Sequence, residues 1–424
     1  MAVLTFGAAS IDITPEPGLL LAGFAARTLP STGIHDRLSA RALVVNDTAI
    51  VVADVIGLHE DMAQRIRARC LLPAANVIVC ATHTHGAPVS MQDRLGAGAD
   101  PHFLQMLEDG CVLAIDTALA NAQPGTMSFG NGCDPDIARN RRHADGPLDR
   151  SLPVLRLRDA TGALVAMVVS YACHPTVLGA DNLQITADFP HYLRQRIETT
   201  NPGVVAIYLN GCTGDVNIGH SAQASWTTSA NATRTFDNAR RIGERIADAA
   251  LAATETALPQ TAHAADRLVE LALERREGDL DAARTAWQAE FVSADPTRKI
   301  LLEHWIAWAS RFRTTPPGTW RGRVACLVWG GVPILALPGE IFAESALSIR
   351  DAGMGEGGFV LSYAEGTPGY IPPRSEYASG GYEVAEAHRF IGMPGSFVPG
   401  SAELLVEAAK TLAAMPDLQA ASQN

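Results

Sequence analysis

Short apolar runs that lead directly into polar or glycine-rich residues recur along this chain. Five of them are rich in Val and Ile, and their length is typical of buried strands. They lie at 76–81, 163–172, 204–209, 332–337 and 359–362. In open α/β sheets, ligands bind beyond the carboxyl ends of the strands. The polar residues that follow these runs are therefore candidates for one shared site.

The remaining pattern predicts the elements that accompany these strands. Residues 39–55 form two β-rich runs around an Asn-Asp turn, which predicts a hairpin, and 60–70 has a helical pattern. Between 262 and 315 the chain changes to long amphipathic stretches, which predict a helical lobe inserted in the core. We expect an α/β fold: a mixed β-sheet core flanked by helices, with this helical insertion.

The composition of the chain indicates which class of protein it is and which partners it can bind. The chain has 424 residues, 47% hydrophobic and 18% charged, which suits a globular protein with a sizeable core. Length alone predicts about two domains, but no linker or repeat divides the chain, and we expect one catalytic domain over 1–424. A net charge of −12 disfavours nucleic acid. Without an export signal or a membrane-inserting run, we expect a cytoplasmic protein, which could form a homo-oligomer.

Three histidines follow strand-like runs. If the strand before Thr82 continues, His83 and His85 project from one face about 6.6 Å apart and can serve one site. His174 also follows an apolar run. One such histidine alone is commonly structural, but histidine is also the commonest metal ligand. Three strand-end histidines together favour a metal or catalytic site.

Two carboxylates complete a candidate hydrolytic site. Glu340 lies at a strand-to-helix junction, where the helix dipole alone would favour a carboxylate. With two histidines it gives the His₂–carboxylate ligand set of catalytic zinc sites, which leaves a position for water. Asp215 follows a glycine-containing loop and could take a proton from attacking water and return it to the leaving group. Turn formation is the simpler role for an aspartate in such a loop.

The cysteines offer a different chemistry. There are seven, without a Cys-x-x-Cys pair, so free buried thiols are favoured over disulfides. A thiol hydrolase would use Cys173 or Cys212 as its nucleophile. His174 is a poor base for Cys173, because adjacent residues of an extended segment point to opposite faces. We therefore disfavour this alternative.

Several short motifs together resemble the neutral/alkaline (non-lysosomal) ceramidase family of zinc-dependent amidohydrolases. In chain order they are GAASIDITP (7–15), GIHD (33–36), ATHTHG (81–86), NR (140–141), ACHPT (172–176), GDVN (214–217), LPGE (337–340) and GY (369–370). The resemblance implies one Zn²⁺ per chain, held by His83, His174, Glu340 and Tyr370. It implies Asp215 as the general base, and it implies that His85, Arg141 and Tyr382 polarise the scissile carbonyl or stabilise the oxyanion.

The resemblance also bears on the substrate. Sphingolipid-cleaving members have serine where this chain has Asn217, a position that the resemblance assigns to binding of the substrate head group. Secreted members carry an immunoglobulin-like domain after the catalytic one, and we expect none here. We expect zinc-dependent cleavage of the C–N amide bond of a small N-acyl compound, with ester or lactone hydrolysis as the alternative and ceramide not favoured. A non-catalytic binding protein on the same fold is the non-enzyme alternative.

Overall fold

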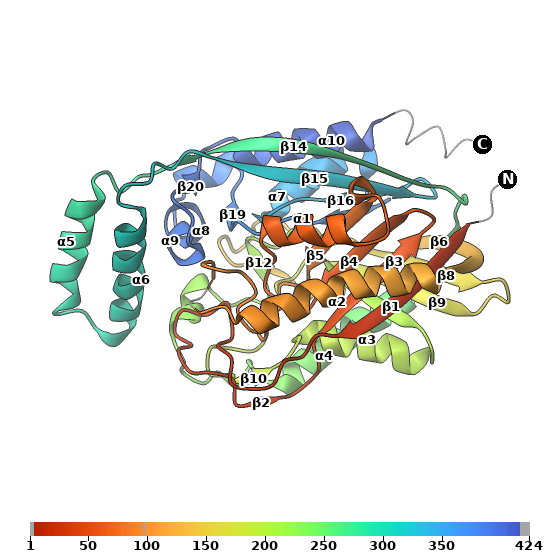
Figure 1. Cartoon of the computed structure of the whole chain (residues 1–424), viewed down its shortest axis with the longest axis horizontal. Helices are drawn as coiled ribbons and strands as arrows, with labels where there is room; N and C mark the ends of the chain where they lie inside the picture. The colour runs from red at the N-terminus through yellow and green to blue at the C-terminus, as the bar shows by residue number, and fades with distance from the viewer. Residues whose placement is uncertain (1–3, 96–97, 416–424) are drawn as a thin grey trace.

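Two mixed β-sheets stacked face to face form the core of the computed structural model, which describes residues 4–95 and 98–415 (Figure 1). The larger sheet has the strand order β11-β9-β8-β6-β1-β3-β4-β5, with β13 paired to β6, and the second has the order β18-β16-β15-β14-β20. The larger sheet consists of β1 (Thr5–Asp12), β3 (Ser39–Val45), β4 (Thr48–Ala53), β5 (Val77–Ala81), β6 (Gln123–Gly132), β8 (Leu152–Asp159), β9 (Leu164–Tyr171), β11 (Val205–Asn210) and β13 (Thr256–Ala257). The second consists of β14 (Ala262–Glu274), β15 (Thr319–Trp329), β16 (Val332–Ala336), β18 (Phe359–Leu361) and β20 (Ser396–Phe397).

The predicted hairpin, β3–β4, shows how the side chains of one strand contribute to two hydrophobic layers, one on each face of the sheet. Its strands pair antiparallel across Asn46, whose φ of 54° is the left-handed conformation of a tight hairpin turn. In β3, Leu43 and Val45 face the second sheet, whereas Ala42 and Val44 face helices on the other side. Because side chains alternate along a strand, one unbroken apolar run fills two hydrophobic layers.

Helices cover the outer face of each sheet. The larger sheet is covered by α1 (Glu60–Arg69), α2 (Pro101–Ala120), α3 (Phe189–Thr200) and α4 (Phe236–Leu251), and the second by α7 (Ala343–Ile349) and α10 (Ser401–Ala413). In Figure 1, α2 crosses in front of β1 and β3. The predicted mixed sheet core with flanking helices is confirmed. Its division into two sheets was not predicted, because a buried apolar run does not indicate which sheet it joins.

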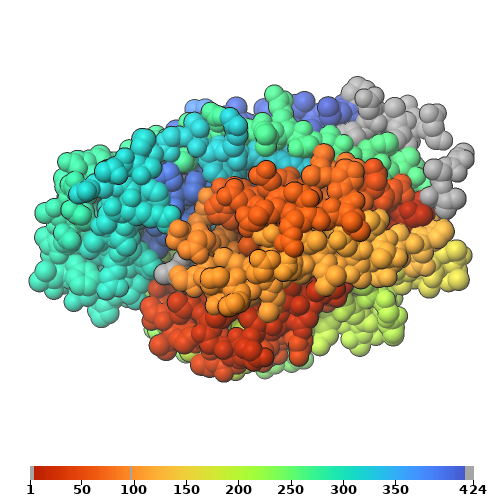
Figure 2. Space-filling view, viewed as in Figure 1, coloured from red at the N-terminus to blue at the C-terminus, as the bar shows by residue number. Residues whose placement is uncertain are grey.

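The lobe consists of two helices, α5 (Leu280–Phe291) and α6 (Pro296–Phe312), which project at one end of the molecule (Figure 1; Figure 2). The prediction of a helical lobe over 262–315 was wrong for its first part, because 262–274 forms the strand β14, antiparallel to β15. Its apolar residues alternate, with Leu271 and Leu273 buried against α10. Sheet pairing and this burial outweigh the helix propensity of its Ala, Leu and Glu residues.

Short ladders and short helices hold the loops around the core. β17 (Glu340–Ile341) pairs parallel with β19 (Tyr370–Ile371), β12 (Val216–Asn217) pairs antiparallel with β7 (Arg139–Asn140), and β2 (Gly33–Ile34) pairs parallel with β10 (Gln184–Ile185). The short helices are η1 (Ala74–Asn76), η2 (Ala222–Trp226), η3 (Arg350–Met354), η4 (Arg374–Ala378), α8 (Tyr382–Ala385) and α9 (Ala387–Ile391). Within the described residues, no helix has the length and apolar character needed to span a membrane.

Candidate metal centre

Three histidine rings meet beyond the ends of β5 and β9. The strand does not continue through His83 and His85, since β5 ends at Ala81 and His83 has a φ of 67°, so the condition for their placement on one strand face is not met. This left-handed conformation costs a non-glycine residue on the order of 1 kcal/mol. Even so, the Nε2 atoms of His83 and His85 lie 3.3 Å apart, and Nε2 of His174 lies 2.8 Å from that of His83. One ligand atom from each of the three rings lies within 4.8 Å of the others, so the group could bind a metal ion.

Backbone hydrogen bonds determine where two of these rings present their lone pairs. Nδ1 of His83 contacts the carbonyl oxygen of Ile56, and Nδ1 of His174 contacts that of Thr213 at 2.7 Å. A carbonyl oxygen only accepts, so each Nδ1 carries the proton and each Nε2 presents a lone pair. Burial lowers the pKa of both imidazoles to about 3, which keeps them neutral at pH 7.

Glu340 adds a carboxylate oxygen to this group. Its Oε2 lies 3.5 Å from Nε2 of His83 and of His174, and it has no hydrogen-bond partner in the described part of the chain. Burial raises the pKa of this carboxyl group. Lone pairs that converge in a buried space without a donor repel each other unless a cation lies between them. Two imidazoles and a carboxylate are ligands that divalent metals accept, so these residues fit a metal ion.

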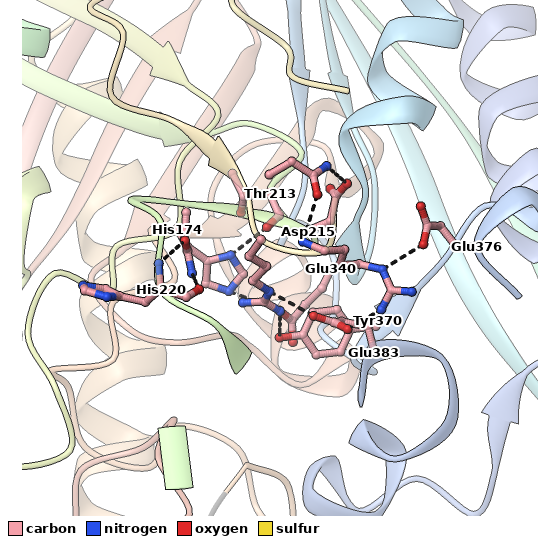
Figure 3. Close-up of polar contacts among 12 residues, drawn as sticks. His174, Thr213, Asp215, His220, Glu340, Tyr370, Glu376 and Glu383 are labelled. Atoms are coloured by element: carbon pink, nitrogen blue, oxygen red, sulfur yellow. Dashed lines mark hydrogen bonds and ion pairs between the residues drawn. The ribbon is translucent and has the colours of Figure 1, made fainter. Parts of the chain in front are cut away.

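Tyr370 and Arg141 form a second side of the site. The β17–β19 ladder sets Tyr370 beside Glu340, and the Tyr370 hydroxyl accepts a hydrogen bond of 3.0 Å from Nη2 of Arg141 (Figure 3). Arg141 Nε donates to Glu383 at 2.9 Å. Burial raises the pKa of the Tyr370 hydroxyl, so the hydroxyl keeps its proton at neutral pH. The guanidinium of Arg141 is thereby oriented from two directions.

Two glutamates of this network were missed by the sequence analysis. Glu383 accepts from both Arg141 and Arg142, and Glu376 accepts from Nε of Arg142 at 2.8 Å (Figure 3). Burial alone would raise the pKa of Glu383, but the charges of the two guanidinium groups hold it below its usual value. Glu383 directly follows Tyr382. Its position beside a predicted site residue was the one signal in the sequence that could have indicated it.

Tyr363 was also missed. Its ring stacks on that of His83 with the centroids 3.9 Å apart, and its hydroxyl lies 2.7 Å from Oγ1 of Thr213. Thr213 also supplies the carbonyl that orients His174. Tyr363 therefore supports the rings of both His83 and His174, and its position two residues after β18 was the only pattern that could have indicated it.

Asp215 is buried, and the protein engages both of its carboxylate oxygens (Figure 3). Oδ1 accepts from the backbone N–H of Ala343 at 2.8 Å, and Oδ2 accepts from Nδ2 of Asn140 at 2.7 Å. Ala343 begins α7, so Asp215 accepts a backbone hydrogen bond at this helix start, whose first turn also contains Glu344. Glu340 lies at the predicted strand-to-helix junction, because it is in β17 just before α7, but it is not a residue of the helix itself. Burial raises the pKa of Asp215 to about 6. Its role as general base stays a prediction.

Two adjoining cavities lie over the histidines. The metal cavity has a volume of about 30 Å³, and its wall includes His83, His85, Arg141, Glu340 and Tyr370. The second cavity, called the apolar cavity because most of its wall is aliphatic or aromatic, has a volume of about 220 Å³. Its wall includes Leu20, Leu21, Phe24, Val89, Trp226 and Phe390, together with the polar side chains of Arg27 and His304. Phe24 and Tyr382 line both. The metal cavity, whose wall includes polar side chains, therefore continues into a mainly apolar one.

Asn217 lines the metal cavity, but its own loop engages its side chain. Its Oδ1 accepts from the backbone N–H groups of Gly219 and His220, and its Nδ2 donates to the His220 carbonyl at 2.7 Å. These bonds fold the segment that follows β12. Substrate binding by Asn217 stays a prediction.

The cysteines do not form a nucleophilic site. Cys173 and Cys212 are buried, and burial raises the pKa of both thiols, so neither is a thiolate at neutral pH. The two ring nitrogens of His174 face Thr213 and His83, which leaves neither for Cys173. The thiol-hydrolase alternative is therefore not supported.

The fold and the site together define a class of protein: a two-sheet α/β protein with a histidine–carboxylate candidate metal centre beyond the strand ends. The chain belongs to the neutral/alkaline non-lysosomal ceramidase family, because the sequence model of that family's N-terminal region matches residues 4–269. The resemblance inferred from the motifs is thus confirmed.

Named relatives and a solved structure agree with this assignment. Neutral ceramidase of Pseudomonas aeruginosa is 27% identical over 272 residues, which are 57% of this chain and 40% of that protein. Neutral ceramidase of Drosophila pseudoobscura pseudoobscura is 29% identical over 227 residues, 46% of this chain and 32% of that protein. The matched segments thus cover 40% and 32% of the length of these relatives. The crystal structure of neutral ceramidase from Pseudomonas aeruginosa has a TM-score of 0.74, covers 97% of this chain and 75% of that chain, and at 21% identity shows the fold.

Proposed function

We propose that this protein is a zinc-dependent hydrolase that cleaves the C–N amide bond of an N-acyl compound. The observation that carries the proposal is the convergence of Nε2 of His83, Nε2 of His174 and Oε2 of Glu340 in a buried space, with His83 and Glu340 lining a cavity. Membership of a ceramidase family supports an amide as the scissile bond. Nitrogen and oxygen donors of this kind suit zinc.

We assign the ligand roles to the four side chains that the family resemblance implies. His83, His174, Glu340 and Tyr370 would hold the ion. When bound, zinc would lower the pKa of a water molecule toward about 7 and polarise the scissile carbonyl. The backbone carbonyls that bind both Nδ1 atoms hold the imidazoles in the tautomer that a metal requires.

The chain's own groups would stabilise charge and transfer the proton. Arg141, His85 and Tyr382 line the metal cavity, where they can donate to a developing oxyanion. Arg141 is already oriented by Glu383, so little reorganisation is needed when charge develops. Asp215, with a pKa of about 6, is suited to exchange a proton near neutral pH. This role requires that Asn140 release Oδ2 of the carboxylate.

The apolar cavity supports an acyl substrate. It adjoins the metal cavity through Phe24 and Tyr382, so a carbonyl at the metal centre can place its alkyl chain among aliphatic and aromatic side chains. Ester or lactone hydrolysis would use the same groups, and a panel of substrates distinguishes the three bond types.

Metal analysis combined with hydrolysis assays tests the proposal. We expect one zinc per chain, amide cleavage that is lost after chelation and restored by zinc, and a His83→Ala variant that loses both metal and activity. His102→Ala, at an exposed position of α2, is the matched control and should retain both. A metal-free protein with full activity would overturn the proposal. Bound zinc without cleavage of any amide, ester or lactone would favour a binding protein on the same fold.

A further inference from the structure

The segment between β12 and α4 forms one wall of the metal cavity. That wall carries a positive charge that forms no hydrogen bond or ion pair within the described residues. The segment contributes Asn217, Ser221, Ala222, Ser225 and Arg234 to that wall. Arg141 is the other arginine of the cavity, and it is held by Glu383 and Tyr370. The guanidinium of Arg234, by contrast, makes no hydrogen bond and has no carboxylate oxygen within 4.0 Å among the described residues.

Packing, not an ion pair, holds Arg234 in this position. Its guanidinium carbon lies 5.7 Å from the centre of the Phe24 ring. Its Cδ runs so close to Gly179 that a Cβ atom on that glycine would lie 2.9 Å away. Asp181 and Asp188 act on Arg234 only at longer range, and burial lowers the pKa of its guanidinium. A partly desolvated cation without a partner gains stability when an anion binds beside it.

Arg234 lies near the histidines and lines the metal cavity but not the apolar cavity. Phe24, under the guanidinium, has its ring centroid 4.9 Å from that of His85. Phe24 lines both cavities, whereas Arg234 lines only the metal cavity. If the acyl chain occupies the apolar cavity and the carbonyl lies at the metal centre, the amine portion of the substrate extends along the polar wall. Asn217 on that wall is engaged by its own loop, so Arg234 is the charged group available there.

We propose that Arg234 binds a carboxylate on the amine portion of the substrate, so that the preferred substrates are N-acyl amino acids. The inference rests on the proposed amide hydrolysis and names its substrate class. The planar guanidinium matches a carboxylate through two parallel N–H···O bonds, which a neutral hydroxyl cannot form. Arg234 is therefore a specificity-determining residue.

Paired substrates with one acyl chain test this assignment. We expect the zinc-loaded wild type to have a kcat/KM at least about tenfold higher for N-lauroylglycine than for N-lauroylethanolamine. Arg234→Gln should lower kcat/KM for N-lauroylglycine by about 10- to 100-fold and change that for N-lauroylethanolamine by less than about threefold. Arg234→Lys keeps the charge but not the planar pair of N–H donors, so its kcat/KM for N-lauroylglycine should lie between those of the wild type and Arg234→Gln. Arg240→Gln, at an exposed position of α4, is the control and should alter neither substrate.

Binding of uncleavable analogues separates the inference from the proposed reaction. In these ketones a methylene replaces the amide nitrogen, and calorimetry compares the acid with the alcohol on wild type and on Arg234→Gln. An acid preference that disappears in the variant supports the role of Arg234 even if no amide is cleaved, in which case only the hydrolase proposal fails. Amide cleavage with equal binding of acid and alcohol, or an equal loss of both in the variant, would overturn the role of Arg234 and leave the hydrolase proposal intact.

Discussion

Replacement of Glu340 by glutamine tests the metal site through the free energy of unfolding. In the metal-free protein, Oε2 of Glu340 faces the Nε2 lone pairs of His83 and His174 and has no hydrogen-bond donor among the described residues. A glutamine amide would donate to one of these nitrogens. Because a buried unsatisfied acceptor costs about 1–3 kcal/mol, we expect the metal-free Glu340→Gln variant to be more stable than the wild type by an amount of this order.

Zinc should remove this advantage. At a free zinc concentration of 100 times the wild-type Kd, the wild type gains about 2.7 kcal/mol from binding. A variant that binds 100-fold more weakly gains only about 0.4 kcal/mol under the same conditions. The stability difference between variant and wild type should therefore change by about 2.3 kcal/mol when zinc is added, in favour of the wild type.

Thermal unfolding in chelator and in buffered zinc measures both differences. For a chain of this size, 1 kcal/mol corresponds to a shift in Tm of about 1–2 °C. Glu303→Gln, at an exposed position of α6, is the matched control and should change neither the metal-free Tm nor the zinc-dependent shift. A Glu340→Gln variant that is less stable than the wild type without metal, or that gains as much from zinc, would refute the reasoning.

Three further predictions concern the base, an ion pair and the corrected strand. Asp215→Asn should retain bound zinc by metal analysis but lose about 10²- to 10⁴-fold in kcat, and an unchanged kcat would mean that Asp215 only supports α7. Burial alone would raise the pKa of Glu277, but the hydrogen bond from His388 and a nearby arginine hold it at about 2. Because this pKa is depressed on folding, the wild type should be more stable than Glu277→Gln above pH 4.5, and this advantage should vanish as the pH falls to about 2. Denaturant unfolding measures the difference, and an advantage that grows in acid would contradict the prediction. Leu271→Ala should cost about 2–5 kcal/mol in unfolding free energy, while Leu268→Ala, 63% exposed on the same strand, should cost under about 0.5 kcal/mol; similar losses would mean that the two residues do not alternate in burial.

Local sequence patterns were sufficient to predict the elements whose burial and length depend on residues close together in the chain. The hairpin at Asn46, the helix α1 and the five apolar strands lie where the sequence predicted them. The position of a polar residue just beyond such a strand also selected His83, His174 and Glu340, which the fold brings together. This succeeded because burial, strand length and the strand end are all properties of neighbouring residues.

The sequence by itself thus determined the class of fold, the family and the polar residues that meet at the candidate metal centre. Only the tertiary structure decided that β14 pairs as a strand, that Asp215 bonds to the start of α7 and that Arg234 lines the metal cavity over the Phe24 ring. Each of these depends on contacts between segments far apart in the chain. The periodicity of apolar residues indicates that a face is buried but not which segment covers it. The sequence likewise gives the charge of a side chain but not the charges that surround it in the fold.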